Sequence, residues 1–221
     1  MTADPAPDDL TGRERRAMVE QQLVRRGIAD ERIMEAMLEV PRHEFVRPED
    51  ADVAHDDRPL PIGHGQTISQ PFMVGYMLER LEVSPDHKVL EVGAGSGYQA
   101  AVLGRIAREV YAIEISAPLA DRARQTVARL GYRNVHIITG DGGLGYPDAA
   151  PFDRIIVAAA CPQIPQPLVA QLIDGGRLVA PVGSAGSQTC LVGVREGEQL
   201  RIVSTIGCVF VPLRGEFGWK R

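Results

Sequence analysis

The chain has 221 residues, of which 44% are hydrophobic and 24% are charged, and its formal net charge is -5 at pH 7. This composition is typical of one globular domain and excludes an intrinsically disordered chain. The acidic balance disfavours a nucleic-acid partner, because phosphate backbones are bound through clustered Lys and Arg. The start of the chain has no basic region followed by an apolar run, and no stretch has the ~20 apolar residues of a membrane span. We therefore expect a cytoplasmic protein without a signal peptide or a membrane contact.

Two amphipathic helices are expected near the N-terminus. The first runs from about Glu14 to Gly27, a glycine at the position of a helix C-cap. The second begins at Asp30, which can act as its N-cap, and ends before Pro41. We expect these helices to form a cap on the domain and residues 1–12 to be a disordered tail.

The segment that follows reads RPLPIGHGQTISQP, from Arg58 to Pro71. Its three prolines and two glycines are expected to exclude regular structure over most of its length. An irregular loop of this kind before a regular core is a candidate substrate-binding element. Apolar residues then recur at helical spacing from Phe72 to Leu81, which predicts a third helix.

From Lys88 onward strands and helices are expected to alternate. Short apolar runs without polar alternation, such as Val89 to Val92, are typical of strands buried on both faces of a parallel sheet, and the intervening helices imply right-handed βαβ units. The last two runs, TCLVGV and RIVSTIG, leave no room for a crossover helix and should pair antiparallel. The predicted fold is α/β, a Rossmann-like, doubly wound, mostly parallel sheet with an antiparallel edge strand and an N-terminal helical cap. In sequence order the other expected strands and helices are VLEVG, a helix from Tyr98, VYAIEI, a helix from Pro118 to Leu130, VHIITG, RIIVAAA, a helix around Leu168 to Ile173, and RLVAPVG.

These elements predict one domain over residues 13–221. Residues 13–86 would form the cap and the substrate loop. Residues 87–221 would form the cofactor-binding core and the C-terminal strands.

The segment VLEVGAGSGYQAA predicts a ligand site at the end of a strand. Gly93, Gly95 and Gly97 let the chain turn tightly and bring backbone N–H groups against a ligand that a Cβ would exclude. A dinucleotide fingerprint would read G-x-G-x-x-G, whereas the glycines here run G-x-G-x-G.

Three acidic residues end consecutive predicted strands and should share one edge of the sheet, where α/β folds bind ligands. They are Glu91, Glu114 and Asp141. Glu114 can accept both hydroxyls of a ribose, and Asp141, in the Gly-Asp-Gly turn, can accept from the amine of adenine. An acidic rim suits a ligand with a positive sulfonium and an amino group better than a pyrophosphate. In type and spacing the set resembles the class I S-adenosylmethionine-dependent methyltransferases.

Several further segments, in order, are similar to the protein-L-isoaspartate O-methyltransferases. They are GQTISQP, VLEVGAGSGYQAA, GDG with GYPDAAPFDRIIVAAACPQIPQ, GGRLVAPVG and FVPLRGEFGW, and they cover the chain from about Met18 to its end. The resemblance implies that S-adenosyl-L-methionine is the cofactor and that Ser69 is the active-site hydroxyl. Where this chain has Gln70 and Phe72, animal members of the family tend to have Ala and His. With the residues named above, the expected cofactor-binding set is Gln66, Thr67, Ile68, Glu91, Gly93, Gly95, Ser96, Gly97, Glu114, Ile115, Asp141 and Gly142.

The resemblance further implies methyl transfer to the free α-carboxylate of L-isoaspartyl residues in damaged proteins and peptides, which starts their repair through a succinimide. We expect the protein to be a monomer. We also expect no metal site, because its five histidines and three cysteines show no metal-ligand spacing. Three alternatives remain open at this point. They are a methyltransferase for a small molecule or another protein group, a nicotinamide dehydrogenase, and a non-catalytic S-adenosylmethionine-binding module.

Overall fold

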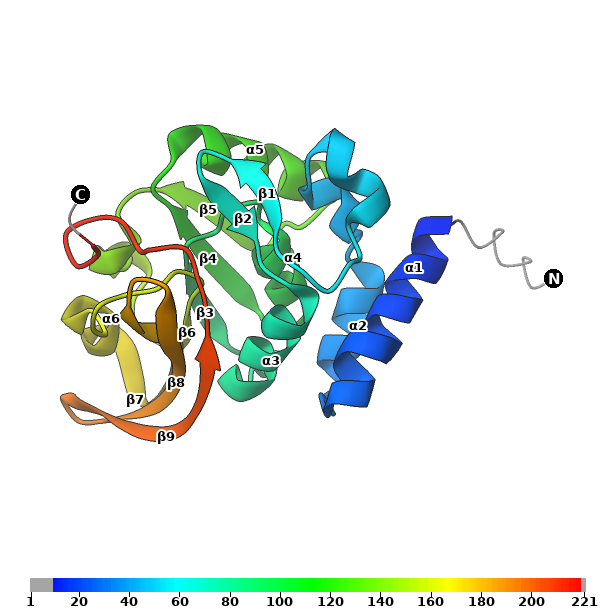
Figure 1. Cartoon of the computed structure of the whole chain (residues 1–221). Coiled ribbons are helices and arrows are strands. Elements are labelled where there is room, and N and C mark those ends of the chain that lie inside the picture. Colours follow the sequence, from blue (N-terminus) through cyan, green and yellow to red (C-terminus); the bar gives the residue numbers. More distant parts are fainter. Residues whose placement is uncertain (1–9, 220–221) are drawn as a thin grey trace.

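A seven-stranded sheet with the strand order β5-β4-β3-β6-β7-β8-β9 forms the centre of the molecule (Figure 1). It is seen in a computed structural model that describes residues 10–219. Strand β8 runs antiparallel to both of its neighbours, and the other neighbouring strands are parallel. The expected mostly parallel sheet with antiparallel pairing toward one edge is therefore confirmed. The strands are β3 (Lys88–Val92), β4 (Glu109–Glu114), β5 (Val135–Thr139), β6 (Phe152–Val157), β7 (Leu172–Ser184), β8 (Ser187–Glu196) and β9 (Gln199–Cys208).

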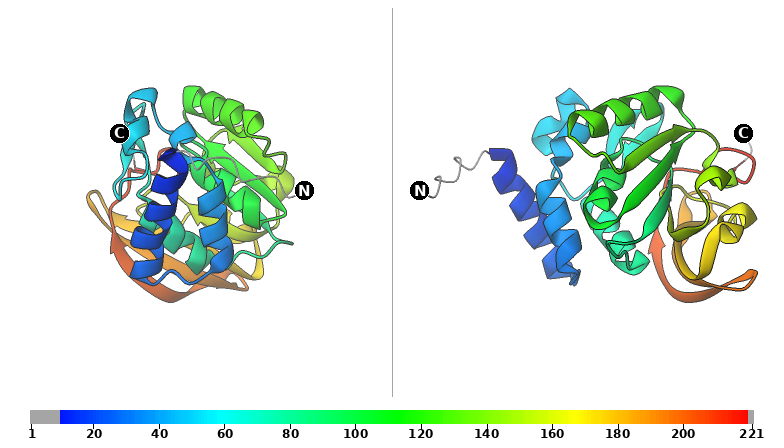
Figure 2. Two further views of the ribbon diagram at one scale, coloured as in Figure 1. Left: turned by 90° about the vertical axis from the view of Figure 1, so that its right-hand side faces the viewer. Right: turned by 180° about the vertical axis from the view of Figure 1, so that it is seen from behind.

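The two faces of the sheet are covered by different segments, because successive strand side chains point to opposite faces. Val89 of β3 belongs to a core with residues of helices α3, α4 and α5, while Leu90 belongs to a second core with residues of α6 and the C-terminal segment. Figure 2 shows this two-sided cover from behind. The fold is thus doubly wound. The helices are α3 (Pro71–Leu81), α4 (Tyr98–Ile106), α5 (Ala117–Arg129) and α6 (Gln166–Ala170).

The N-terminal helices pack outside α3 and α4 (Figure 1). Helix α1 (Leu10–Met18) continues through a π-helical turn and a 3-10 turn to Gly27, whose φ of 87° is left-handed as a glycine C-cap requires. Helix α2 (Glu31–Glu39) is capped by the Asp30 side chain, which accepts from the backbone of Arg32. Both helices are confirmed, but residues 10–12 of the expected tail belong to α1. The remainder of that tail, residues 1–9, lies outside the described residues.

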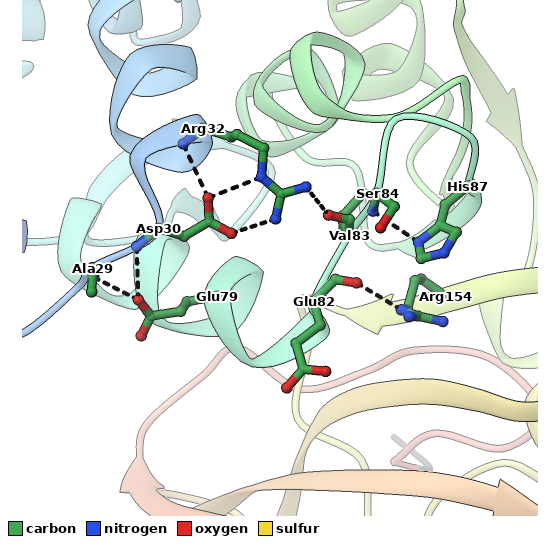
Figure 3. A network of polar contacts seen from close by, with 9 residues as sticks. All are labelled: Ala29, Asp30, Arg32, Glu79, Glu82, Val83, Ser84, His87 and Arg154. Atoms are coloured by element: carbon green, nitrogen blue, oxygen red, sulfur yellow. Dashed lines mark hydrogen bonds and ion pairs between the residues drawn. The ribbon is translucent and has the colours of Figure 1, made fainter.

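Polar contacts fix this helical cap to the end of α3 (Figure 3). The Arg32 guanidinium donates to the carbonyl of Val83 at 2.8 Å and to the Asp30 carboxylate. The Glu79 carboxylate accepts from the backbone of Ala29 at 2.6 Å and of Asp30 at 3.2 Å. The start of α2 is thereby held against the helix that leads into the sheet.

The proline- and glycine-containing segment before α3 forms a β-hairpin, which the sequence did not predict. Strands β1 (Leu60–Gly63) and β2 (Gln66–Ile68) pair antiparallel. Leu60 and Ile62 are buried while the residues between and after them are exposed, so the segment has the period of a half-buried strand. His64 and Gly65 both have positive φ and make the turn.

Smaller differences from the sequence prediction lie at element ends. Helix α6 ends at Ala170, because β7 starts as early as Leu172.

Within residues 10–219, no helix is long and apolar enough to cross a membrane. Short helical turns complete the structure at Arg42–Phe45, Pro48–Val53, Gly142–Leu144 and Pro147–Ala149.

Candidate cofactor and substrate site

The glycine loop lies at the point where the chain changes direction across the sheet. From β3 the chain adds β4 and β5 on one side, and it then returns to place β6 on the other side of β3. A switch point of this kind leaves a crevice at the carboxyl ends of the strands, where α/β folds bind ligands. Gly93, Gly95 and Gly97 occupy it with φ values of 92°, 54° and 86°. These left-handed conformations explain the glycines directly.

The Glu114 carboxylate, at the end of β4, is oriented by two backbone N–H groups. One oxygen accepts from Gly95 at 2.8 Å and the other from Ser116 at 2.8 Å. The residue is only 5% exposed. Each carboxylate oxygen can accept more than one hydrogen bond, so a fixed pair of acceptor sites remains for a ligand.

The Glu91 carboxylate is buried without a partner. The residue is fully inaccessible to solvent, and neither side-chain oxygen has a hydrogen-bond partner among the described residues. Burial, together with the nearby Glu114 carboxylate, raises the pKa of Glu91 well above its ordinary value. A buried acid that no protein group satisfies fits a positively charged ligand in the adjoining space. The sulfonium and ammonium groups of S-adenosylmethionine meet that requirement.

Four cavities meet around these acids. The outer cavity has a volume of about 740 Å³, and it shares Gln66 and Ile115 with the Glu114 cavity of about 40 Å³. Gly93 connects the Glu114 cavity with the Glu91 cavity of about 30 Å³. Thr67 and Ser69 line both the Glu91 cavity and the Ser69 cavity, which has a volume of about 300 Å³. Neighbouring cavities thus adjoin one another past both acids and up to Ser69.

Most of the residues predicted from the sequence line these cavities. Around the Glu91 cavity they are Thr67, Ile68, Ser69, Glu91, Gly93, Gly95 and Ser96. Around the Glu114 cavity they are Gln66, Gly93, Glu114, Ile115 and Gly142. At Gly142 a Cβ would lie 2.5 Å from Val92, so this position requires glycine.

Two predicted residues have a different environment. Gly97 caps α4, and a Cβ there would point at Ala123 of α5, 3.2 Å away, instead of at a cavity. The Asp141 carboxylate accepts from the backbone of Gly143 at 2.9 Å and of Glu216 at 2.7 Å. Asp141 therefore holds the C-terminal segment against the end of β5, a contact that the sequence did not predict.

Comparison with known proteins identifies the family of the chain. The sequence model of the protein-L-isoaspartate(D-aspartate) O-methyltransferases matches residues 13–218. The chain belongs to this family. A protein-L-isoaspartate O-methyltransferase from Methanoculleus marisnigri is 50% identical over 100% of this chain and 98% of its own length. One from Methanoregula boonei is 51% identical over 94% of this chain and 95% of its own length.

Solved structures of protein-L-isoaspartate O-methyltransferases have the same fold. One superposes with a TM-score of 0.84 at 29% identity and covers 92% of this chain and 67% of its own. Another, from Plasmodium falciparum, has a TM-score of 0.77 at 25% identity and covers 90% of this chain and 98% of its own. The latter structure is a complex with S-adenosyl-L-homocysteine. The cofactor of this methyltransferase family is thus S-adenosyl-L-methionine.

Several cavity-lining residues of this methyltransferase were not singled out from the sequence. Ala158 lines both the Glu91 cavity and the Ser69 cavity, and Arg214 and Trp219 line the outer cavity. The last two belong to the FVPLRGEFGW segment, which carried part of the family resemblance without an assigned residue. Ala158 directly follows β6, so its place at a strand end was the available signal.

Cys161 is a structural residue of this family member. It is fully buried, its Sγ lies 3.3 Å from the carbonyl oxygen of Pro181, and burial raises the pKa of its thiol to about 12. A thiol with this pKa is not a nucleophile at neutral pH. Within residues 10–219, no group of three or more His, Cys, Asp or Glu side chains is placed to hold a metal ion.

Proposed function

We propose that the chain transfers the methyl group of S-adenosyl-L-methionine to the free α-carboxylate of L-isoaspartyl residues in damaged proteins and peptides. This leaves S-adenosyl-L-homocysteine. The backbone amide nitrogen then attacks the methyl ester and displaces methanol to form a succinimide, and water reopens the succinimide in part to normal aspartate. One observation carries the proposal for this chain's own residues. Ser69 lies where the Glu91 cavity meets the Ser69 cavity, within a segment that the family match covers.

Four segments would hold the cofactor, at residues 66–68, 91–97, 114–115 and 141–142. Glu114 offers two fixed acceptor sites for the ribose hydroxyls, because Gly95 and Ser116 hold its carboxylate in place. Glu91 offsets the positive charge of the ligand. When bound, S-adenosyl-L-methionine supplies an electrophilic methyl group on a positively charged sulfur. The other proposed cofactor-binding residues are Gln66, Thr67, Ile68, Gly93, Ser96, Gly97, Ile115, Asp141 and Gly142.

The Ser69 cavity would receive the isoaspartyl residue. Its lining is largely apolar and includes Met73, Phe210 and Val211. An apolar wall excludes water from the substrate carboxylate, whose hydration would otherwise weaken it as a nucleophile. The half-buried Ser69 hydroxyl can donate one hydrogen bond to that carboxylate and hold an oxygen toward the Glu91 cavity.

The reaction needs no general base from the protein. A carboxylate with an ordinary pKa of ~4 is already ionised at pH 7. The side chains therefore contribute position, charge and the exclusion of water. This assigns Ser69 the role of an orienting group and not of a nucleophile.

Matched peptides test the proposed reaction. The protein is incubated with labelled S-adenosyl-L-methionine and two peptides that differ only in an isoaspartyl or an aspartyl linkage. We expect base-labile label in the isoaspartyl peptide and none in the aspartyl peptide. Equal labelling of both peptides, or of neither when a small-molecule acceptor is labelled, would refute the assignment.

We further propose that the protein acts as a monomer with a single domain over residues 13–221 and is located in the cytoplasm. Cys161, Cys190 and Cys208 are free thiols, which suits a reducing compartment. Light scattering during size-exclusion chromatography measures the oligomeric state, and a dimer mass would contradict the proposal.

A further inference from the structure

Arg42, in the helical turn after α2, is a cation in the interior of the protein. Its side chain has no exposed surface. Its Nε donates to the carbonyl of Ala54 at 2.7 Å, and its Nη2 donates to the carbonyl of Ser69 at 2.8 Å. Both donors thus serve backbone carbonyls instead of a carboxylate. The third nitrogen, Nη1, has no hydrogen-bond partner among the described residues.

Burial of this charge is not explained by packing. Removing a guanidinium from water is costly, and two neutral carbonyls compensate less than a carboxylate would. A long apolar side chain such as methionine would fill a similar volume without that cost. Methionine, however, could not donate hydrogen bonds to the carbonyls of Ala54 and Ser69, which lie 15 positions apart in the chain. The planar guanidinium of Arg42 does so. The position therefore favours a donor over a hydrophobic residue.

The carbonyl of Ser69 is the contact that matters for the site. Ser69 follows β2 and precedes α3, and no backbone N–H of the described residues donates to its carbonyl in a turn, loop or cap. Because the peptide group is planar, fixing this carbonyl also fixes the plane that joins Ser69 to Gln70. The direction of the Ser69 side chain into the two cavities depends on that plane.

Arg42 also contacts the other side of the Glu91 cavity. Its guanidinium carbon lies 4.8 Å from the ring centroid of Tyr98, the first residue of α4. Tyr98 is buried and lines the Glu91 cavity with Ser69. One side chain from the N-terminal cap thus contacts both the glycine-loop side and the hairpin side of the site.

We propose that Arg42 is a positioning residue for the methyl transfer. It holds the Ser69 hydroxyl in place between the Ser69 cavity, which would receive the substrate, and the Glu91 cavity, which would receive the cofactor. This rests on the proposed function, since it assigns a role within that reaction. Arg42 does not reach substrate itself. Its effect passes through the Ser69 carbonyl.

Kinetics of three variants test this role. Arg42→Met removes both hydrogen bonds, and Arg42→Lys keeps the charge without the fork. Arg32→Met is the matched control, since it also removes a bond to a carbonyl, that of Val83, at a position away from Ser69 (Figure 3). We expect Arg42→Met to lower kcat by about 10- to 100-fold, because a displacement of ~1 Å can cost that much. The kcat of Arg42→Lys should lie between that of Arg42→Met and the wild type, and Arg32→Met should keep the wild-type value.

Combination with Ser69→Ala separates positioning from a general loss of structure. If Arg42 acts through the Ser69 hydroxyl, Arg42→Met should lower kcat by less than about threefold once that hydroxyl is absent, because coupled positions are not additive. The affinity for S-adenosyl-L-homocysteine, measured by calorimetry, should fall by a smaller factor than kcat in each Arg42 variant, because Arg42 does not contact the Glu114 carboxylate, which Gly95 and Ser116 hold. Fully additive losses, or an unchanged kcat in Arg42→Lys, would overturn the proposal. Should Arg42→Met fail to fold, the same cycle with Arg42→Lys decides.

Hydrogen exchange gives a readout that needs no substrate. Amide exchange over residues 66–70 should accelerate in Arg42→Lys, while exchange within α5 stays at the wild-type rate. Unchanged exchange over residues 66–70 would refute the positioning role even in a protein that methylates no isoaspartyl peptide. Faster exchange in a protein without that activity would instead refute only the proposed function.

Discussion

Glu91 is a residue at which folding and ligand binding make opposite demands. Its carboxylate is fully buried and unpartnered, which penalises the charged form in the ligand-free protein. The same charge is what the proposed cofactor requires. A residue that lowers stability in exchange for binding is a common feature of functional sites.

The conflict at Glu91 predicts a pH-dependent gain in stability for Glu91→Gln. Burial raises the pKa of Glu91 in the folded protein, so between its ordinary value of ~4.3 and the raised value the folded state binds more protons than the unfolded state. The contribution of Glu91 to stability therefore falls as the pH rises through that window. Without cofactor, the melting temperature of Glu91→Gln relative to wild type should rise as the pH increases above about 4.3. A difference that stays constant with pH would contradict this reasoning.

Ser69→Ala should separate orientation from stability. Loss of one hydrogen bond to a charged group is worth about 1.5 to 3 kcal/mol, so kcat/KM for an isoaspartyl peptide should fall by about 10- to 150-fold. The affinity for S-adenosyl-L-homocysteine should change much less. Steady-state kinetics and calorimetry on the same preparation measure both quantities. Full activity with a lowered melting temperature would show instead that Ser69 serves only the loop before α3.

At the scale of elements, the C-terminal segment after β9 completes the site. It bridges back to the sheet at Ala160 and Pro212, and its Arg214, Gly215 and Trp219 line the outer cavity. Asp141 holds it there through the backbone of Glu216. The Asp141 carboxylate, which was expected to accept a hydrogen bond from adenine, thus binds the segment that lines the outer cavity.

Asp141→Ala should weaken both the fold and the outer cavity. The variant loses the cap on Gly143 and the bond to Glu216, and loss of a cap alone costs about 1 kcal/mol in the free energy of unfolding. Urea unfolding measures that loss, and calorimetry should show weaker binding of S-adenosyl-L-homocysteine. Asp174→Ala is the control, because Asp174 likewise accepts from a backbone amide, that of Gly197, in a hairpin remote from the site. Equal affinities in the two variants would show that the segment does not shape the cavity.

The sequence predicted the elements whose signal is local. Buried apolar runs such as Val89 to Val92 mark parallel strands, and Asp30 and Gly27 mark helix ends, because each signal acts within a few residues. The β1–β2 hairpin was missed, since its prolines and glycines were interpreted as loop residues although they build the turn and an edge strand.

The roles of Arg42 and Asp141 were not predictable in the same way. Arg42 looks like any charged residue after a helix, and only the packing of the cap over the hairpin and α4 buries it. Asp141 stands in a turn of common type, and its partner Glu216 is 75 positions away in the chain. Contacts of this range depend on the whole fold, so no spacing in the sequence encodes them.

At the scale of the whole molecule, the site draws on the full length of the chain. Arg42 comes from the helical cap, Ser69 from the segment before α3, Glu91 and Glu114 from the centre of the sheet, and Trp219 from the C-terminal end. The family match over residues 13–218 covers all of this set except Trp219. The proposed cofactor pocket therefore depends on the complete fold and not on the glycine loop alone.

The position of the C-terminal segment has a consequence for the order of events during synthesis. Ribosomes make the glycine loop and both acids long before residues 212–219, yet those last residues wall the outer cavity and pack Leu213 into the core beneath it. A nascent chain can thus form its sheet while its pocket still lacks one side. The outer cavity is therefore complete only once residues 212–219 have left the exit tunnel.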